Sequence, residues 1–278
     1  MTRNSVEDYL LESLNPRVDA NRRLVEYEIR PGNTVTFSSP VDLTQIENIR
    51  SAAVQAGTIR PSYTAFIAKA VALGLQEFPY ANRRVCKHVW PPFVNRLQRF
   101  HHCDVAVAAE RMIEGAESVA FVDILRDAER LSLAEMTEWL ANLARCDETT
   151  NAQWRDFSRV TQLPWFIALP LLRLPHYFPG LWVKWRGAAA LISSPAKYGV
   201  QSLVATWPWP LGFSFGYVSP RPMVNENNEI VVKICFDFVL NFDRRVMAGA
   251  PAAKFFRRIV DLLESASVSL ADDAPRNN

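Results

Sequence analysis

The chain has 278 residues, of which 49% are hydrophobic and 22% charged, as in ordinary globular proteins. Its formal net charge of +2 is too small to indicate binding to nucleic acid or to an anionic membrane. The four cysteines form no C-x-x-C pair, which disfavours structural zinc and a redox motif. The N-terminus is acidic and amphipathic without an apolar signal core, so we expect a protein of the reducing cytoplasm.

The first half of the chain predicts helices and strands in alternation. Pro31-Gly32-Asn33 favours a hairpin turn, Pro79 ends a long apolar helix, and Ser132 with Glu135 forms a capping-box pattern. The expected elements are a short helix over 6–14, strands over 24–29 and 35–41, helices over 42–56 and 62–78, strands over 84–90, 99–109 and 118–124, and a helix ending near 144.

The segment from Thr161 to Trp185 is apolar and contains four prolines. The prolines and Arg173 exclude a regular membrane span of about twenty apolar residues. Three interpretations remain open for this segment: a buried core or interface, the apolar wall of an acceptor pocket, or a membrane-surface segment.

The C-terminal part predicts a long strand followed by the last helix. Apolar residues alternate with polar ones from Val232 to Phe242, which indicates a half-buried strand. The apolar positions between Ala252 and Ala266 have helical spacing. The joint between the two elements reads Asp243-Arg244-Arg245-Val246-Met247-Ala248-Gly249, and rigid joints at a sheet's end often carry sites.

This joint resembles the signature of the acyltransferase core of the 2-oxo acid dehydrogenase complexes, a relative of chloramphenicol acetyltransferase. The family pattern is Asp-His-Arg-x-x-Asp-Gly, and Asp243, Arg245 and Gly249 match it. Arg244 stands where the family has its general-base histidine, and Ala248 stands where it has the second acid. The resemblance therefore implies the family's fold while contradicting its mechanism.

Two further stretches carry the resemblance. The long helix and its exit through Pro79 and Asn82 are similar to the family's core helix, and Ile192-Ser193-Ser194 resembles its Thr-Ile-Ser-Asn-Leu-Gly segment. The implied fold is an α/β two-layer sandwich with a mixed sheet over residues 21–268. We expect an N-terminal helix or arm over 1–20, a disordered tail over 269–278, and neither a lipoyl domain nor a subunit-binding module.

The resemblance implies an active site in a channel at the subunit interface of a trimer. Ser193 or Ser194 is then the hydroxyl that binds the tetrahedral oxyanion, although a strand-end serine bonded to backbone is an equal alternative. Arginine has no lone pair available, so Arg244 cannot act as a base. It can bind an anion, or pair structurally with Asp243 or Asp237.

A base could come from another histidine. His101 and His102 lie on the strand nearest the family's donor side, and His176 is the third candidate, although strand-start histidines are more often surface residues. We expect His176, Trp207 and Trp209 to contact substrate. His101 and Asp104 make a weak metal pair because no third ligand has suitable spacing, and no metal is expected.

The leading hypothesis is an acyltransferase-like protein of specialised metabolism that uses acyl-CoA or a carrier thioester and a small-molecule acceptor. The alternatives are a catalytically silent trimeric scaffold and an enzyme repurposed for elimination or cyclisation. We expect a homotrimer with an acyl carrier protein as a candidate partner, no permanently bound cofactor, no nucleic acid and no membrane span.

Overall fold

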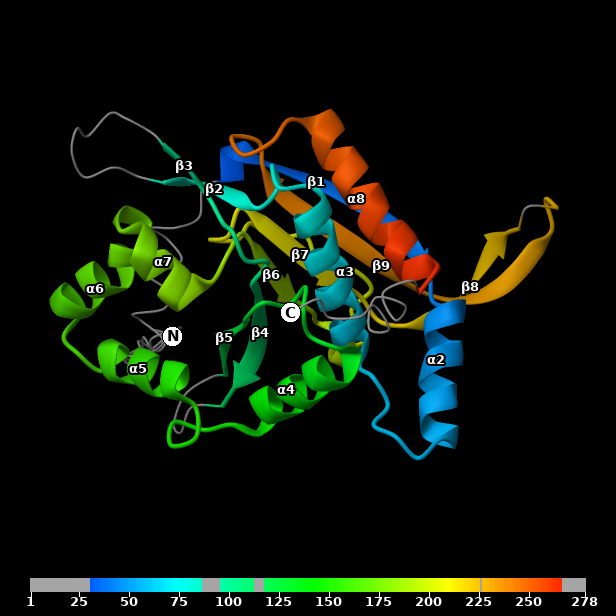
Figure 1. The fold of residues 1–278 in the computed structure, drawn as a ribbon, viewed down its shortest axis with the longest axis horizontal. Coiled ribbons are helices and arrows are strands. Elements are labelled where there is room, and N and C mark those ends of the chain that lie inside the picture. The colour runs from blue at the N-terminus through cyan, green and yellow to red at the C-terminus, as the bar shows by residue number, and fades with distance from the viewer. Residues whose placement is uncertain (1–30, 87–95, 113–117, 226, 267–278) are drawn as a thin grey trace, which may run out of the picture.

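The computed structural model describes residues 31–86, 96–112, 118–225 and 227–266. The arm over 1–20, the helix over 6–14, the strand over 24–29 and the tail over 269–278 lie outside these residues, so they stay predictions. Within them the chain forms a mixed sheet covered on both faces by helices and irregular chain (Figure 1).

Seven strands of the described chain form the main sheet in the order β1-β9-β7-β6-β4-β5, with β8 added to the first half of β9. β6 pairs in parallel with β4 and β7, and the other pairs are antiparallel. These strands are β1 Thr34–Asp42, β4 Val105–Arg111, β5 Val119–Leu125, β6 Ala190–Ser193, β7 Leu211–Phe215, β8 Ser219–Val224 and β9 Ile230–Asp243. The predicted mixed α/β sheet is confirmed.

One face of the sheet packs on helices α3 and α8, which cross it side by side (Figure 1). Phe213 of β7 meets Phe255 of α8 at 6.1 Å between ring centroids, and Phe238 of β9 stacks on Phe256 at 5.6 Å. We call this the helix face. The helices here are α2 Thr44–Gln55, α3 Tyr63–Glu77, α4 Leu133–Arg145 and α8 Gly249–Glu264. The predicted Ser132 capping box is present on α4.

The opposite face of β7 carries only small residues, Gly212 and Ser214, and Gly216 directly follows the strand. Because alternate residues of a strand point to the same face, the chain over 200–209 can cross directly on them. The Ser214 hydroxyl donates to the Leu203 carbonyl at 2.6 Å. A Cβ added at Gly212 would lie 1.7 Å from the Trp207 ring. We call this side the back face.

The proline-rich segment forms helices, which the sequence did not predict. They are α6 Trp165–Tyr177 and α7 Pro179–Arg186, and α5 Ala152–Thr161 comes directly before them. Pro170 and Pro175 lie inside α6, and Pro179 occupies the first turn of α7, where it is tolerated. The three helices stand beside β5 (Figure 1). No helix of the described chain is both long and apolar enough to cross a membrane.

Two strand predictions need correction. The strand expected over 99–109 is divided between β3 Arg96–Arg99, paired with β2 Arg83–Cys86, and β4. Between β3 and β4 the backbone hydrogen-bonds to side chains and not to a neighbouring strand. The Asn82 side chain donates to the His102 carbonyl, and the Glu129 carboxylate accepts from the Cys103 amide. β8 was not predicted, and its two prolines disfavoured a strand there.

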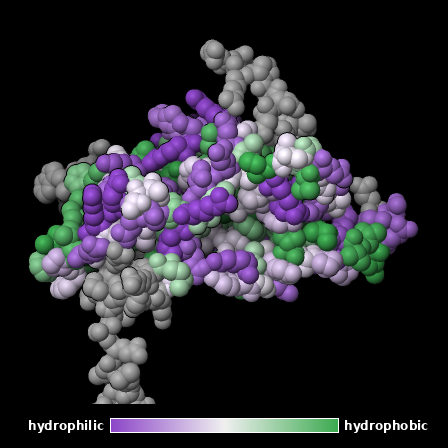
Figure 2. All heavy atoms as spheres, turned by 90° about the horizontal axis from the view of Figure 1, so that it is seen from below, coloured by the Kyte–Doolittle hydropathy of each residue, from purple (hydrophilic) through white to green (hydrophobic). Residues whose placement is uncertain are grey.

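Exposed apolar side chains gather at the two ends of the molecule, over α6 and over the β8–β9 hairpin (Figure 2). Val232 and Ile234 of β9 are 74% and 36% exposed, because this half of the strand extends beyond the helices and pairs only with β8. The alternation predicts that these two residues face the core, and this prediction is wrong.

Candidate active site at the end of strand β9

Asp243 and Arg245 form an ion pair at the junction of β9 and α8. Nε of Arg245 donates to both oxygens of Asp243 at 3.0 Å, and Nη2 donates to Oδ2 at 2.6 Å. The backbone amide of Arg245 adds a bond to Oδ1 at 2.9 Å. The hydrogen bond to Asp243 raises the pKa of Arg245. This contact fixes the turn in which Arg244 lies.

Arg244 is exposed, and its side chain makes no hydrogen bond or ion pair within the described residues. Its backbone amide donates to the Asn33 carbonyl at 2.9 Å, so the residue is held while its guanidinium faces solvent. The expected pairing of Arg244 with Asp243 or Asp237 is wrong. Asp243 binds Arg245, and Asp237 binds Arg221 of the neighbouring strand at 2.6 Å.

A second arginine supports the same turn. Arg83 of β2 donates from Nε and Nη2 to the Val246 carbonyl at 3.1 and 2.6 Å. Ala248 occupies the cap position of α8 and offers no capping side chain. A Cβ added at Gly249 would meet nothing within 4 Å. The turn is therefore rigid and positively charged, with open space at its glycine.

Ser193 is the last residue of β6 and Ser194 follows it, and the two candidate serines have different environments. The Ser194 hydroxyl donates to the Phe215 carbonyl at 2.7 Å and accepts from the Ala196 amide at 3.1 Å. These bonds tie the chain after β6 to the end of β7. The half-buried hydroxyl of Ser193 has no bond within the described residues, so it is the one able to donate to a ligand.

Ser193 and Arg244 do not meet in one chain. Ser193 pairs through Ser214 with Val239 of β9, whereas Arg244 follows the end of that strand. Four residues of strand separate Val239 from Asp243, which corresponds to roughly 13 Å along the sheet. The serine and the arginine therefore lie at opposite ends of the sheet.

The candidate histidines are at the arginine end. His101 and His102 precede β4, which runs parallel to β6, so they lie opposite Ser193. Both are exposed. His102 Nδ1 bonds Asp127 Oδ1 at 2.5 Å, and Glu129 lies close enough for these three to share a metal. The Glu129 carboxylate also accepts from the Cys103 amide at 3.2 Å, so it helps to hold the chain before β4.

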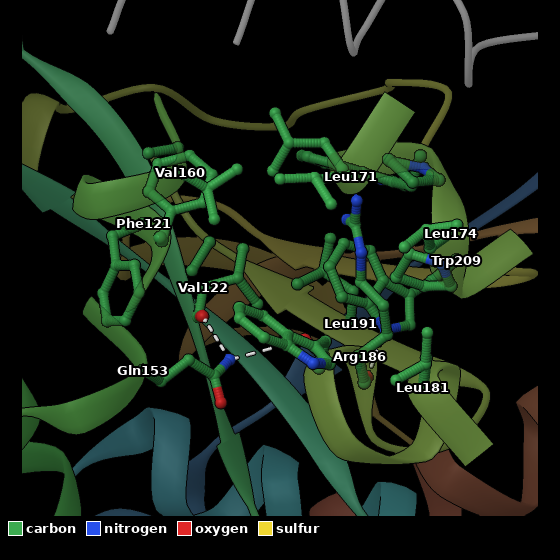
Figure 3. Close-up of a pocket in the computed structure, with 18 of the residues that line it drawn as sticks. Phe121, Val122, Gln153, Val160, Leu171, Leu174, Leu181, Arg186, Leu191 and Trp209 are labelled. Carbon is green, nitrogen blue, oxygen red and sulfur yellow. Dashed lines mark hydrogen bonds between the residues drawn. The ribbon is translucent and has the colours of Figure 1, made fainter. Parts of the chain in front are cut away.

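Trp207 and Trp209 line a cavity of about 460 Å³ on the back face (Figure 3), and no residue of the β9–α8 turn is among its lining residues. His176 is not among its lining residues; its ring packs edge-on against Trp182 at 5.5 Å between centroids. The cavity also takes its walls from α5 and α6. Sequence reasoning missed them, although one interpretation of 161–185 as a pocket wall pointed to this place.

The mixed sheet, the serine at the end of β6 and the Asp-Arg-Arg turn before the last helix define an acyltransferase core. Residues 30–162 and 185–271 match the family of 2-oxoacid dehydrogenases acyltransferase (catalytic domain), and the chain belongs to this family. The match omits 163–184, which hold α6 and most of α7.

A curated relative in Bacillus subtilis is the dihydrolipoyllysine-residue acetyltransferase component of the acetoin cleaving system. It is 26% identical over 245 residues, which cover 83% of this chain and 49% of the relative. The chain thus spans about half the length of this relative.

Solved structures show the same fold. The cubic core of a pyruvate dehydrogenase complex has a TM-score of 0.69 and 19% identity, covering 97% of this chain and 98% of that one. A probable dihydrolipoamide acetyltransferase from Listeria monocytogenes has a TM-score of 0.63 and 17% identity, covering 99% of both chains. The Azotobacter vinelandii dihydrolipoamide acetyltransferase has a TM-score of 0.68 and 18% identity, covering 97% and 98%.

Proposed function

We propose that this chain transfers an acyl group from a CoA or carrier thioester to a small acceptor that is already ionised. The observation that supports this is the exposed, unpaired guanidinium of Arg244 at the position of the family's general base. A fixed cation in a basic turn binds an anion, and arginine does so with two parallel donors.

The chemistry then needs no base from the protein. A thiolate or enolate held by Arg244 attacks the thioester carbonyl, and a new bond to the acyl carbon forms. The tetrahedral oxyanion accepts a hydrogen bond from Ser193, which lowers the barrier by about 3 kcal/mol in comparable sites. When the intermediate collapses, the C–S bond breaks and the donor leaves as a thiolate that takes a proton from water.

The proposed site requires two copies of the chain, because Ser193 and Arg244 lie at opposite ends of one sheet. Ser193 of one copy would face Arg244 of the next in a homotrimer. The relative described as a cubic core is an assembly of such domains. Loss of the trimer should therefore abolish transfer even if each chain stays folded.

A second candidate function is a catalytically silent, acyl-binding scaffold. The observation favouring it is that Ala248 replaces the second acid while Arg244 replaces the base, so two functional positions have changed together. The two candidates differ in turnover, which makes them separable by one assay.

The assay follows thiol release from acetyl-CoA and longer acyl-CoAs with an acidic thiol acceptor, beside a mass determination in solution. The variants are Arg244→Gln and Ser193→Ala, with Arg159→Gln as the control that removes an exposed cation from α5. We expect turnover by the wild-type trimer, a loss of at least tenfold in both site variants, and no change in the control. A folded trimer without turnover on any thioester would support the scaffold instead.

A further inference from the structure

Helix α6 is apolar around most of its circumference, yet much of it is exposed. No charged residue occurs between Arg159 and Arg173, so the outer face of the helix is as apolar as the inner one. Ala168, Leu172 and Pro175 form the buried face. A helix of this composition is normally covered on all sides. The large apolar side chains left exposed on α6, on α7 and just before them are Leu163, Trp165, Phe166, Ile167, Leu171, Phe178 and Val183, with exposed fractions of 38–60%. We call these residues the apolar end.

The apolar end is an addition to the acyltransferase core. All of its residues lie in the stretch 163–184 that the family match omits. The helices α6 and α7 stand at one end of the molecule beside β5, which is the edge strand of the sheet (Figures 1 and 2). A contact that the family's domains share would use the matched residues. The partner of the apolar end is therefore specific to chains that carry this addition.

The charges next to the apolar end are positive. The sequence has no aspartate or glutamate over residues 157–225. Lys184 of α7 is exposed. The side chain of Arg126, which is 42% exposed, donates to the carbonyls of Val183 and Lys184 at 2.7 Å. Its carboxylate partner Asp104 is buried, so the cation is presented at the surface and the acid is not.

The β2–β3 hairpin continues the basic surface. Gln98 of β3 donates to the Pro179 carbonyl at the start of α7 at 3.1 Å, so the hairpin lies against this helix. The sequence has no acid over residues 78–103, and Arg99 is exposed. A twofold contact between two copies through this surface would bring its cations against one another. An anionic partner is favoured instead.

The shape and composition of the apolar end match a membrane surface. α6 has 13 residues, fewer than the roughly twenty that a spanning helix needs, so it can lie on a bilayer but not cross it. Large apolar and aromatic side chains flanked by lysine and arginine are typical of segments that lie at the boundary between headgroups and acyl chains. The exposed rings of Phe166 and Phe178 supply such groups.

We infer that the apolar end docks on the surface of an anionic lipid bilayer. Its side chains insert among the lipid headgroups, and Lys184, Arg126 and Arg99 lie near the phosphates. The net charge of +2 does not oppose this, because attraction to a surface depends on the charges within a Debye length of it. The inference goes beyond the proposed transfer reaction and does not rest on it.

Flotation of the full chain with vesicles tests the docking. One set is phosphatidylcholine alone, and the other contains about one third phosphatidylglycerol. We expect binding to the anionic vesicles that is at least tenfold tighter than to the neutral ones and that weakens as salt is raised. The double variant Phe166→Gln with Ile167→Gln should bind at least tenfold more weakly, and Lys184→Gln several-fold more weakly.

Matched controls remove similar groups elsewhere. Val232→Gln takes away an apolar side chain that is 74% exposed on β9, and Lys254→Gln takes away an exposed cation on α8. Both should bind the anionic vesicles like wild type. Arg244→Gln should do so as well, so failure of the transfer proposal would leave this result intact. Circular dichroism checks that every variant is folded, and the exposed positions make folding the expected result.

Three outcomes would overturn the inference. The first is a wild-type chain that stays unbound with anionic vesicles at low salt. The second is a folded double variant with wild-type binding, because the apolar end would then not be the docking surface. The third is a double variant whose mass in solution falls below that of wild type, which would show that another copy of the chain covers the apolar end.

Discussion

Arg245 binds the carboxylate of Asp243 through Nε and Nη2, while the adjacent Arg244 takes no part in the pair. One arginine therefore stabilises the turn and the other faces solvent. Arg244 is held at its backbone by Asn33, so its exposed guanidinium stands on a fixed support, as the proposed anion-binding role requires. The turn keeps Asp243, Arg245 and Gly249 of the family pattern, and Arg244 stands at the position of its histidine.

Asp243→Asn tests whether the ion pair with Arg245 stabilises the turn. The amide accepts one bond from Arg245 and loses the charge, so the free energy of unfolding should fall by about 1 kcal/mol for this partly exposed pair. Urea unfolding measures it. Glu264→Gln, which removes another partly exposed ion-pair acid, is the control, and an Asp243 variant as stable as wild type would show that the pair is not structural.

Gly212→Ala should destabilise the back face, because the new methyl group collides with Trp207. We expect a loss of about 1–3 kcal/mol, as for other overpacked sites. If the collision is the cause, Trp207→Ala should remove much of the penalty in a double-mutant cycle. Strictly additive effects in urea unfolding would argue against contact between the two residues.

Arg84 joins β2 to the end of α6. It is 3% exposed, lies 4.1 Å from the ring centroid of Trp182, and donates to the Pro175 carbonyl at 3.2 Å. Burial lowers its pKa to about 10. Arg84→Met leaves carbonyls at the helix end without a donor, so we expect a loss of about 2–4 kcal/mol.

The matched control for Arg84 is Arg99→Met on the exposed strand β3, which should change stability by less than about 0.5 kcal/mol. Calorimetry or urea unfolding measures both. Equally small losses of stability in both variants would mean that Arg84 does not stabilise the C-terminal end of α6.

Stability should fall at alkaline pH. Burial, with the nearby acids, raises the pKa of the Cys103 thiol to about 12, and burial with the Glu47 hydrogen bond raises that of Tyr63 to about 12. The unfolded chain ionises these groups near 9 and 10, so it releases protons that the folded chain keeps. The stability that these two neutral groups contribute is fully present below pH 9 and is lost as the pH rises towards 12.

We expect a decrease of roughly 2 kcal/mol between pH 9 and 11, measured by urea unfolding across that range. Cys103→Ala and Tyr63→Phe should each flatten the curve. A wild-type curve that is flat to pH 11 would contradict the burial of these two groups.

Much of the helix face could be predicted from sequence, because its signals are local. Ser62 caps α3 and Ser132 caps α4 through the hydrogen bonds that their side chains predict. The alternation up to Phe242 identified the inner part of β9. The back face could not be predicted from sequence. Gly212, Ser214 and Gly216 leave room for the chain over 200–209 to cross the sheet, and that segment has no periodic pattern that would reveal the contact.

The site was predicted in part for a similar reason. The motif located Asp243 and Arg245, but spacing along the chain does not say which of two adjacent arginines binds the acid. The prolines in α6 disfavoured a helix prediction. In the structure Arg84 of the distant strand β2 donates to the Pro175 carbonyl near the end of this helix. That contact is tertiary, so no local pattern of residues contains it.

The most direct test of Arg244 as an anion-binding group is the pH dependence of acyl transfer to a series of thiols with different pKa values. We predict that the rise of the transfer rate with pH has its midpoint at the pKa of each thiol acceptor. Arg244→Lys should keep part of the rate, and Arg244→Gln should lose it. A limb fixed near pH 6.5 for every acceptor would reveal a histidine base in the protein and contradict this account.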